Sequence, residues 1–293
     1  MLGSVRAKTG LLLVAVVVLA GCGAVDTASG PGQPTTTLTP APVPEERGPD
    51  GGRLIAPGLS TRGVFDADAL VEGHRTTLTE RGFALTRNRT VVRPNDTASR
   101  RPLNTVGVRI VVAPGADSYH LTRVERSVRE WPFVDTYALI GVWYSEPVVR
   151  NRFVDEGRVA RYWGQNQAAS DGPVRDLTQV RSARPDLEAV DLRVVGNRTV
   201  DGVRVFRLRG ERFEDPDELV TPPLLSDPRN VSMTARIDER SVVRSYSLSF
   251  EATFGGGPVR VRRTYRVTDV GATTVDRPAW VTRANESVAS EGQ

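Results

Sequence analysis

The chain has 293 residues, with 39 Lys or Arg against 35 Asp or Glu, and its formal net charge is +4. It contains one Cys and two His. A single Cys excludes a disulfide framework within the chain and a Cys-based zinc site. With 39% hydrophobic and 25% charged residues, the composition is typical of a globular protein rather than a disordered one.

The N-terminus has the pattern of a secretory signal peptide over residues 1–21. Two cations, Arg6 and Lys8, precede an apolar run at residues 11–20, which is too short to span about 30 Å of hydrocarbon as a helix. The run ends in Leu-Ala-Gly-Cys, which matches a prokaryotic lipobox. Because the only Cys of the chain stands where this motif is lipidated, we predict that Cys22 carries a lipid anchor. A cleaved signal peptide followed by an incidental Cys is the alternative.

Removal of the signal peptide changes the charge of the protein and sets its location. Cleavage before Cys22 removes two of the 39 basic residues. It leaves 37 basic residues against 35 acidic residues. A nearly neutral chain gives little reason to expect a nucleic-acid partner, which favours a strong basic patch. A lipidated Cys22 would hold the protein at the outer face of the cell membrane, which is an extracytoplasmic location.

Composition divides the mature chain into a tether and a domain. Residues 22–56 are rich in Gly, Pro and Thr and contain too few large apolar residues to offset the entropy of ordering, so we predict a disordered tether. Residues 57–288 are long enough for a single domain with its own core. Residues 289–293 are predicted to form a disordered tail.

Five N-x-S/T sequons follow the signal peptide, and in an exported chain they are candidates for N-glycosylation. They are Asn88, Asn95, Asn197, Asn230 and Asn285. Unmodified strand and loop asparagines are the alternative, because such sequons are common by chance.

One amphipathic helix opens the predicted domain. Asp66 is a candidate N-cap and Gly82 a candidate stop. Between them one stripe at helical spacing carries four apolar residues and a histidine: Ala67, Leu70, Val71, His74 and Leu78. We expect His74 to be packed and hydrogen-bonded rather than to act as a ligand or a base.

After Gly82 the period of the apolar residues changes to two, which indicates antiparallel strands with one buried face. Four segments alternate in this way: 106–112, 231–237, 246–252 and 259–267. Arg263 interrupts the apolar face of the last segment. A turn at residues 256–257 would join the last two segments and place Leu248 opposite Tyr265. Residues 134–144 are apolar on both faces, which predicts a strand covered on two sides.

Seven apolar residues on these strands are candidates for lining a concave face. They are Val106, Val108, Ile110, Trp143, Tyr246, Leu248 and Phe250. The same residues would equally well form an ordinary core.

Both ends of the predicted domain resemble a family of uncharacterised haloarchaeal lipoproteins. Residues 63–90 carry His74-Arg75 and Asn88-Arg89-Thr90, and the C-terminal match closes with Pro278-Ala279-Trp280. This resemblance brings no established activity.

More distantly, a tethering Cys followed by a helix and a long meander resembles the LolA/LolB and LppX/LprG lipoproteins. That resemblance implies an α+β fold, in which an antiparallel meander sheet curves into a half-open β-barrel and the N-terminal helix packs on its concave face. It also implies a lipid or another hydrophobic ligand on that face.

The sequence contains no hydrolase, zinc-protease or nucleotide-binding signature. We therefore expect no catalytic residues, no metal, no cofactor and no enzymatic activity. An outward stripe of Arg260, Arg262 and Arg266 is expected to be a solvated, salt-bridged strand face, with contact to anionic headgroups as the alternative.

Two functions remain as hypotheses. The first is a membrane-anchored lipoprotein that binds a lipid or other hydrophobic ligand on the concave face of its sheet. The second is a structural or interaction protein of the cell envelope that binds a protein or a glycan through its outer face.

The lipid anchor is directly testable. Cys22→Ser should leave the protein unlipidated and shift it from the membrane fraction to the medium, as measured by fractionation and intact mass. A mutant that still partitions with the membrane at high salt would contradict the lipobox assignment.

Overall fold

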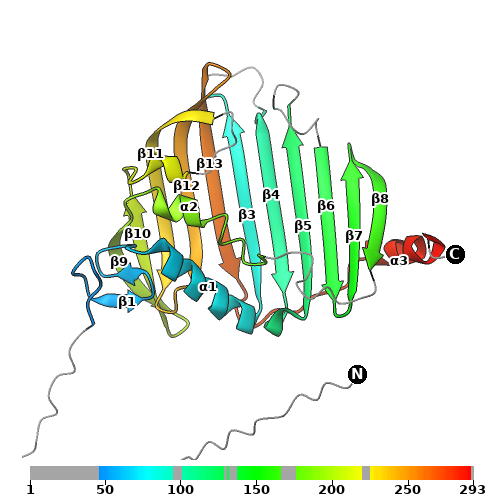
Figure 1. The fold of residues 1–293 in the computed structure, drawn as a ribbon, viewed down its shortest axis with the longest axis horizontal. Coiled ribbons are helices and arrows are strands. Elements are labelled where there is room, and N and C mark those ends of the chain that lie inside the picture. The colour runs from blue at the N-terminus through cyan, green and yellow to red at the C-terminus, as the bar shows by residue number, and fades with distance from the viewer. Residues whose placement is uncertain are drawn as a thin grey trace, which may run out of the picture. The chain divides into compact units, whose positions relative to one another are not determined.

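The computed structural model describes residues 46–94, 101–128, 131, 137–165, 176–219 and 225–291. The signal peptide, Cys22, most of the predicted tether and the sequon at Asn95 lie outside the described residues. The described part is built on a curved, open, 11-stranded antiparallel sheet with few helices, as Figure 1 shows. The predicted α+β half-barrel fold is therefore confirmed.

The sheet consists of two meanders joined side by side. The first comprises β3 (Phe83–Val92), β4 (Asn104–Val112), β5 (Ser118–Ser127), β6 (Tyr137–Ser145), β7 (Val148–Asp155) and β8 (Arg158–Gln165). The second comprises β9 (Arg193–Val200), β10 (Val203–Gly210), β11 (Leu225–Asp238), β12 (Val243–Phe254) and β13 (Gly257–Thr268). The strand order is β8-β7-β6-β5-β4-β3-β13-β12-β11-β10-β9, so the pairing of β3 with β13 joins the two meanders.

The remaining elements are short. They are the hairpin β1 (Leu54–Ala56) and β2 (Leu59–Ser60), helices α1 (Ala67–Arg81), α2 (Arg184–Glu188) and α3 (Trp280–Glu291), and the 3-10 turns η1 (Pro114–Ala116) and η2 (Pro216–Glu218). Within the described residues, no helix is long and apolar enough to cross a bilayer.

Alternation along the strands gives the sheet two chemically different faces. We call the face that α1 and α2 cover the inner face, and Figure 1 shows both helices in front of the strands there. Leu85, Ile110 and Leu248 point to this face and are at most 1% exposed. The opposite, outer face carries mainly Ser, Thr and Arg on β11, β12 and β13.

Helix α1 forms as predicted. The Asp66 side chain accepts a hydrogen bond from the Ala69 N–H at 2.9 Å and caps the N-terminus. Gly82 ends the helix with a positive φ of 72°. All five residues of the predicted stripe are buried, including His74.

The β12–β13 hairpin differs from the prediction by two residues. The turn is Gly255-Gly256, not residues 256–257, and both of these glycines have positive φ, which a type I′ turn requires. Tyr246 therefore lies opposite Tyr265, and Leu248 lies opposite Arg263. The alternation of apolar residues fixes only which face of the sheet each side chain lies on. A pairing that is shifted by two residues keeps every side chain on the same face, so the alternation cannot distinguish the two registers.

The ordered part begins earlier and ends later than predicted. Residues 46–56, which were assigned to the tether, contain β1, and the Leu54 N–H donates to the Glu46 carbonyl at 2.9 Å. Pairing with β2 and burial of Ala56 offset the ordering entropy there. The predicted tail at 289–293 is helical through Glu291, because it continues α3.

Helix α3 was not predicted, and it forms a second, small apolar cluster on the outer face. Trp280, Val281 and Ala284 are buried against Trp143 and Tyr162. The predicted two-sided strand is β6, whose inner side carries the buried Val142 and whose outer side is covered in part by α3. Residues 134–136 of that prediction lie outside the described part.

Candidate functional site

The structure places six of the seven predicted ligand-lining residues on the inner face. Val108, Ile110, Tyr246, Leu248 and Phe250 are buried in the main core, and Val106 is half-buried against it. Ile110, Leu248 and Phe250 are at most 1% exposed, so these three side chains fill the core rather than line an open hollow. Trp143 points to the outer face and joins Trp280 instead. Neighbouring residues of β6 are apolar on both sides, so alternation alone did not assign Trp143 to a face.

A buried ion pair lies between the sheet and α2. Arg263 on β13 and Asp186 on α2 are 4% and 0% exposed, and an Arg263 guanidinium N–H donates to the Asp186 carboxylate. The Tyr246 hydroxyl donates to the other carboxylate oxygen at 2.9 Å. The guanidinium also lies 5.5 Å from the centre of the Phe250 ring. Burial, together with the charge of Asp186, raises the pKa of Tyr246 well above its usual value.

A second polar chain fixes α1 to the sheet. His74 Nδ1 accepts from the Val243 backbone N–H at 3.0 Å, and His74 Nε2 lies 2.9 Å from the Tyr265 hydroxyl. Tyr265 in turn donates to the Thr178 carbonyl at 2.7 Å. His74 Nε2 must therefore carry the imidazole hydrogen and donate it to Tyr265, so the histidine is neutral. This confirms that His74 is packed and hydrogen-bonded.

The inner face continues as a partly exposed apolar surface on the first meander. Ile140 on β6 is 36% exposed and pairs directly with the half-buried Phe153 on β7. Trp163 on β8 is also half-buried, and the Arg161 guanidinium lies 5.4 Å from the centre of its ring. We call Ile140, Phe153 and Trp163 the inner apolar patch. In Figure 1, α1 and α2 lie over the other half of the sheet, away from β6–β8.

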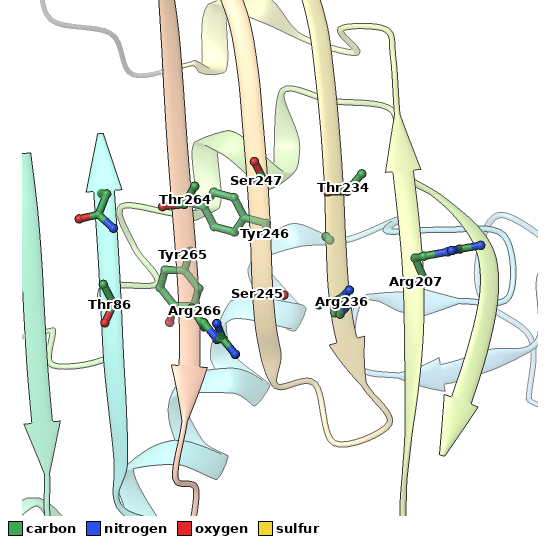
Figure 2. Close-up of a pocket in the computed structure, with 12 residues that line it drawn as sticks. Thr86, Arg207, Thr234, Arg236, Ser245, Tyr246, Ser247, Thr264, Tyr265 and Arg266 are labelled. Carbon is green, nitrogen blue, oxygen red and sulfur yellow. The ribbon is translucent and has the colours of Figure 1, made fainter. Parts of the chain in front are cut away.

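Several hollows of the described structure lie on the outer face, and charged and hydroxyl side chains contribute much of their lining. One, of about 700 Å³, extends from β3 to β10 and is lined by Thr86, Asn88, Arg207, Thr234, Arg236, Ser245, Ser247, Thr264 and Arg266, together with Ala235, Tyr246 and Tyr265. Figure 2 shows its arginines and hydroxyl side chains on neighbouring strands. Adjoining hollows of about 250 Å³ and 550 Å³ share Arg198 and Arg236 with each other.

The predicted outward arginines differ in their surroundings. Arg260 pairs with Glu251 at 3.3 Å, as expected of a salt-bridged strand face, and Arg266 lines the 700 Å³ hollow. Among the sequons, Asn88 lines the same hollow, and Asn197 and Asn230 are exposed. The remaining described sequon, at Asn285 on α3, accepts a hydrogen bond from Arg150 at 2.6 Å.

Sequence reasoning missed Asp186, Arg207 and Arg236. Asp186 follows a proline in a segment with no clear period, and no sequence pattern linked it to Arg263. Arg207 and Arg236 acquire meaning only through the cross-strand register, which places them directly opposite each other. No group of three or more His, Cys, Asp or Glu side chains in the described residues is arranged to hold a metal ion.

Comparison with known proteins adds distant likenesses. Residues 177–284 match a family of unknown function, DUF7537. No curated protein matches the sequence. The structure is similar to the crystal structure of LprF from Mycobacterium bovis, with 11% identity, 74% of this chain and 99% of that chain covered, and a TM-score of 0.33. It is also similar to a DUF1329 family protein from Desulfovibrio piger, with 10% identity, 73% and 94% covered, and a TM-score of 0.24.

The burial of His74 predicts a loss of stability in acid. Burial lowers the pKa of His74 from 6.5 to about 3, helped by the positive charge of Arg244. Below pH 6.5 the unfolded chain therefore binds a proton that the folded chain does not, and stability falls as the pH falls. The expected loss is about 1.4 kcal/mol per pH unit, or roughly 2 kcal/mol from pH 6.5 to pH 5.

Urea unfolding at pH 7 and pH 5 measures this loss, and His74→Gln should remove most of it. The matched variant is His120→Gln, since His120 is only half-buried and should account for a smaller share. If His74→Gln kept the full acid dependence of the natural protein, the assignment of His74 would be wrong.

Proposed function

We propose that this chain is an extracytoplasmic lipoprotein, anchored through Cys22, whose sheet domain is a non-enzymatic binding module. Its inner apolar patch would accept an acyl chain or a similar hydrophobic ligand. The proposal is carried by one observation, the exposure of Ile140 and the partial exposure of its neighbours on the face that elsewhere forms the core.

The geometry favours the patch over the region beneath the helices. Under α1 and α2 the side chains of Ile110 and Leu248 are completely buried, so a ligand there would have to displace packed core atoms. On β6 and β7, Ile140 and Phe153 face each other directly and still have surface to bury. Burying that surface against an acyl chain is favourable by about 25 cal/mol per Å².

Charge next to the patch is compatible with a ligand that has an acidic head group. Arg161 pairs with Phe153 across β7 and β8 and is exposed. Its guanidinium already lies over the Trp163 ring. A fatty acid lying on the patch would bring its carboxylate close to a fixed cation, an arrangement that adds orientation to apolar contact.

A second candidate function is supported by a different surface. The arginine-lined hollow on the outer face suits an interaction protein of the cell envelope that recognises an anionic partner. This surface shares no side chain with the inner apolar patch, so the two functions are separable by mutation.

The inner apolar patch predicts co-purified or added lipid. Native mass spectrometry should detect bound lipid, and a fluorescent fatty acid should bind to the purified full chain. The double variant Ile140→Ala and Phe153→Ala should weaken that binding roughly tenfold to a hundredfold, because it removes about 1.5–3 kcal/mol of apolar contact.

The control is Val195→Ala on β9, which also removes an exposed apolar side chain, 48% exposed, but far from the patch in the strand order. It should leave the affinity unchanged. A clean ligand-free mass together with no binding of the fluorescent fatty acid would contradict the proposal.

A further inference from the structure

Arginines recur in one row across the outer face. Arg207 on β10 lies directly opposite Arg236 on β11, and Arg236 lies opposite Ser245 on β12. Ser245 in turn lies opposite Arg266 on β13. These three arginines therefore stand at one level on strands that run side by side.

The row continues into the first meander. Arg266 lies opposite Thr86 on β3, and Thr86 lies opposite Arg109 on β4. We call Arg207, Arg236, Arg266 and Arg109 the arginine row. Neighbouring strands lie about 4.8 Å apart, so Arg207 and Arg236 are separated by about 5 Å across the sheet. Arg236 and Arg266, and then Arg266 and Arg109, are two strands apart, or about 10 Å each, and the whole row spans roughly 24 Å.

The arginine row presents exposed positive charge. All four side chains are exposed, and none of them forms an ion pair with another residue of the described part of the chain. Other exposed arginines do have partners, for example Arg193 with Asp191 and Arg260 with Glu251. Like charges directly opposite each other, as in Arg207 and Arg236, are destabilising. An external anion would remove that repulsion.

A row of hydrogen-bonding groups runs beside the arginines. Two residues further along each strand, Thr234 pairs with Ser247, Ser247 with Thr264, and Thr264 with Asn88. All four line the 700 Å³ hollow together with three members of the arginine row. Figure 2 shows the hydroxyl groups and the arginines on the same strands. This floor offers both donors and acceptors to a polyhydroxylated ligand.

The shape of the hollow and its aromatic residues indicate which class of anionic ligand fits it. A flat bilayer cannot follow a hollow in the sheet, whereas a single polymer chain can. Single-stranded nucleic acid would need aromatic side chains for base stacking. The two aromatic residues at this hollow, Tyr246 and Tyr265, stack on each other on the inner face, with ring centres 5.4 Å apart. No carboxylate is among the described residues that line the 700 Å³ hollow. Carboxylates border the row elsewhere: Asp201 and Asp269 line the 550 Å³ hollow, and Asp269 and Asp276 line a further hollow of about 650 Å³ together with Arg109.

We propose that the arginine row and the polar floor beside it bind a linear acidic polysaccharide. Sulfate or carboxylate groups of the sugar chain pair with the guanidinium groups, and its hydroxyl groups bond to the Ser, Thr and Asn side chains. The strand spacing sets the spacing of the charges that fit best. This site lies on the opposite face from the inner apolar patch and does not depend on lipid binding.

The test uses the full chain and a sulfated heparin oligosaccharide as the probe, with neutral dextran, anionic lipid vesicles and oligo-dT as comparisons. The triple variant Arg207→Gln, Arg236→Gln, Arg266→Gln should weaken heparin binding at least tenfold and reduce its salt dependence. Dextran should not bind. Any binding of vesicles or oligo-dT to the natural protein should be unchanged in the triple variant.

A matched variant controls for net charge. Arg75→Gln, Arg193→Gln and Arg260→Gln together remove the same charge from exposed arginines that are ion-paired to Glu72, Asp191 and Glu251. This control should bind heparin within about twofold of the natural protein. Thermal unfolding checks that both variants fold, as expected for exposed positions.

Three results would overturn the proposal: no binding of heparin, an equal loss in the control variant, or row-dependent binding of vesicles or oligo-dT in place of heparin.

Discussion

The buried ion pair between Arg263 and Asp186 is the interaction on which the rest of the structure depends. Arg263 lies on β13, the strand that joins the two meanders, and its side chain enters the apolar inner face. Left unpaired there, a guanidinium would carry a large desolvation cost. Asp186 neutralises it and ties α2 to the centre of the sheet, so breaking the pair should cost about 3–5 kcal/mol.

This pair also decides how the two faces are used. With α2 held by Asp186 and α1 held by His74, the inner face over the second meander is closed and packed. The inner face over β6–β8 extends beyond these helices and keeps the exposed Ile140. The outer face then carries polar groups, and its register gathers Arg207, Arg236 and Arg266 around one hollow. Each face therefore offers a different kind of ligand surface.

The sequence alone predicted the elements whose signals are local. The α1 stripe, its caps and the alternation in β4, β11, β12 and β13 depend on neighbouring residues, and all are present. Arg263 was recognised as an interruption of an apolar face, because side chains along a strand alternate between the two faces of the sheet. Its partner Asp186 was not found, since the two residues are 77 positions apart and only packing brings them together.

The features that were missed depend on long-range register and packing. The alternation of apolar residues is compatible both with a turn at Gly255-Gly256 and with a turn one residue later. The predicted pairing of β12 with β13 was therefore displaced by two residues. The arginine row is invisible in the sequence, because its four members come from β10, β11, β13 and β4. Helix α3 escaped notice because only its first turns are buried, and their partners Trp143 and Tyr162 lie far earlier in the chain.

The most direct test of this division between faces is a titration of isotope-labelled protein with a sulfated oligosaccharide, observed by NMR at the arginine side-chain Nε–Hε groups. The signals of Arg207, Arg236 and Arg266 should shift in a saturable way, while that of the buried Arg263 stays in place. Shifts confined to inner-face arginines such as Arg123 and Arg161, or no shift in the arginine row at saturating ligand, would contradict the division.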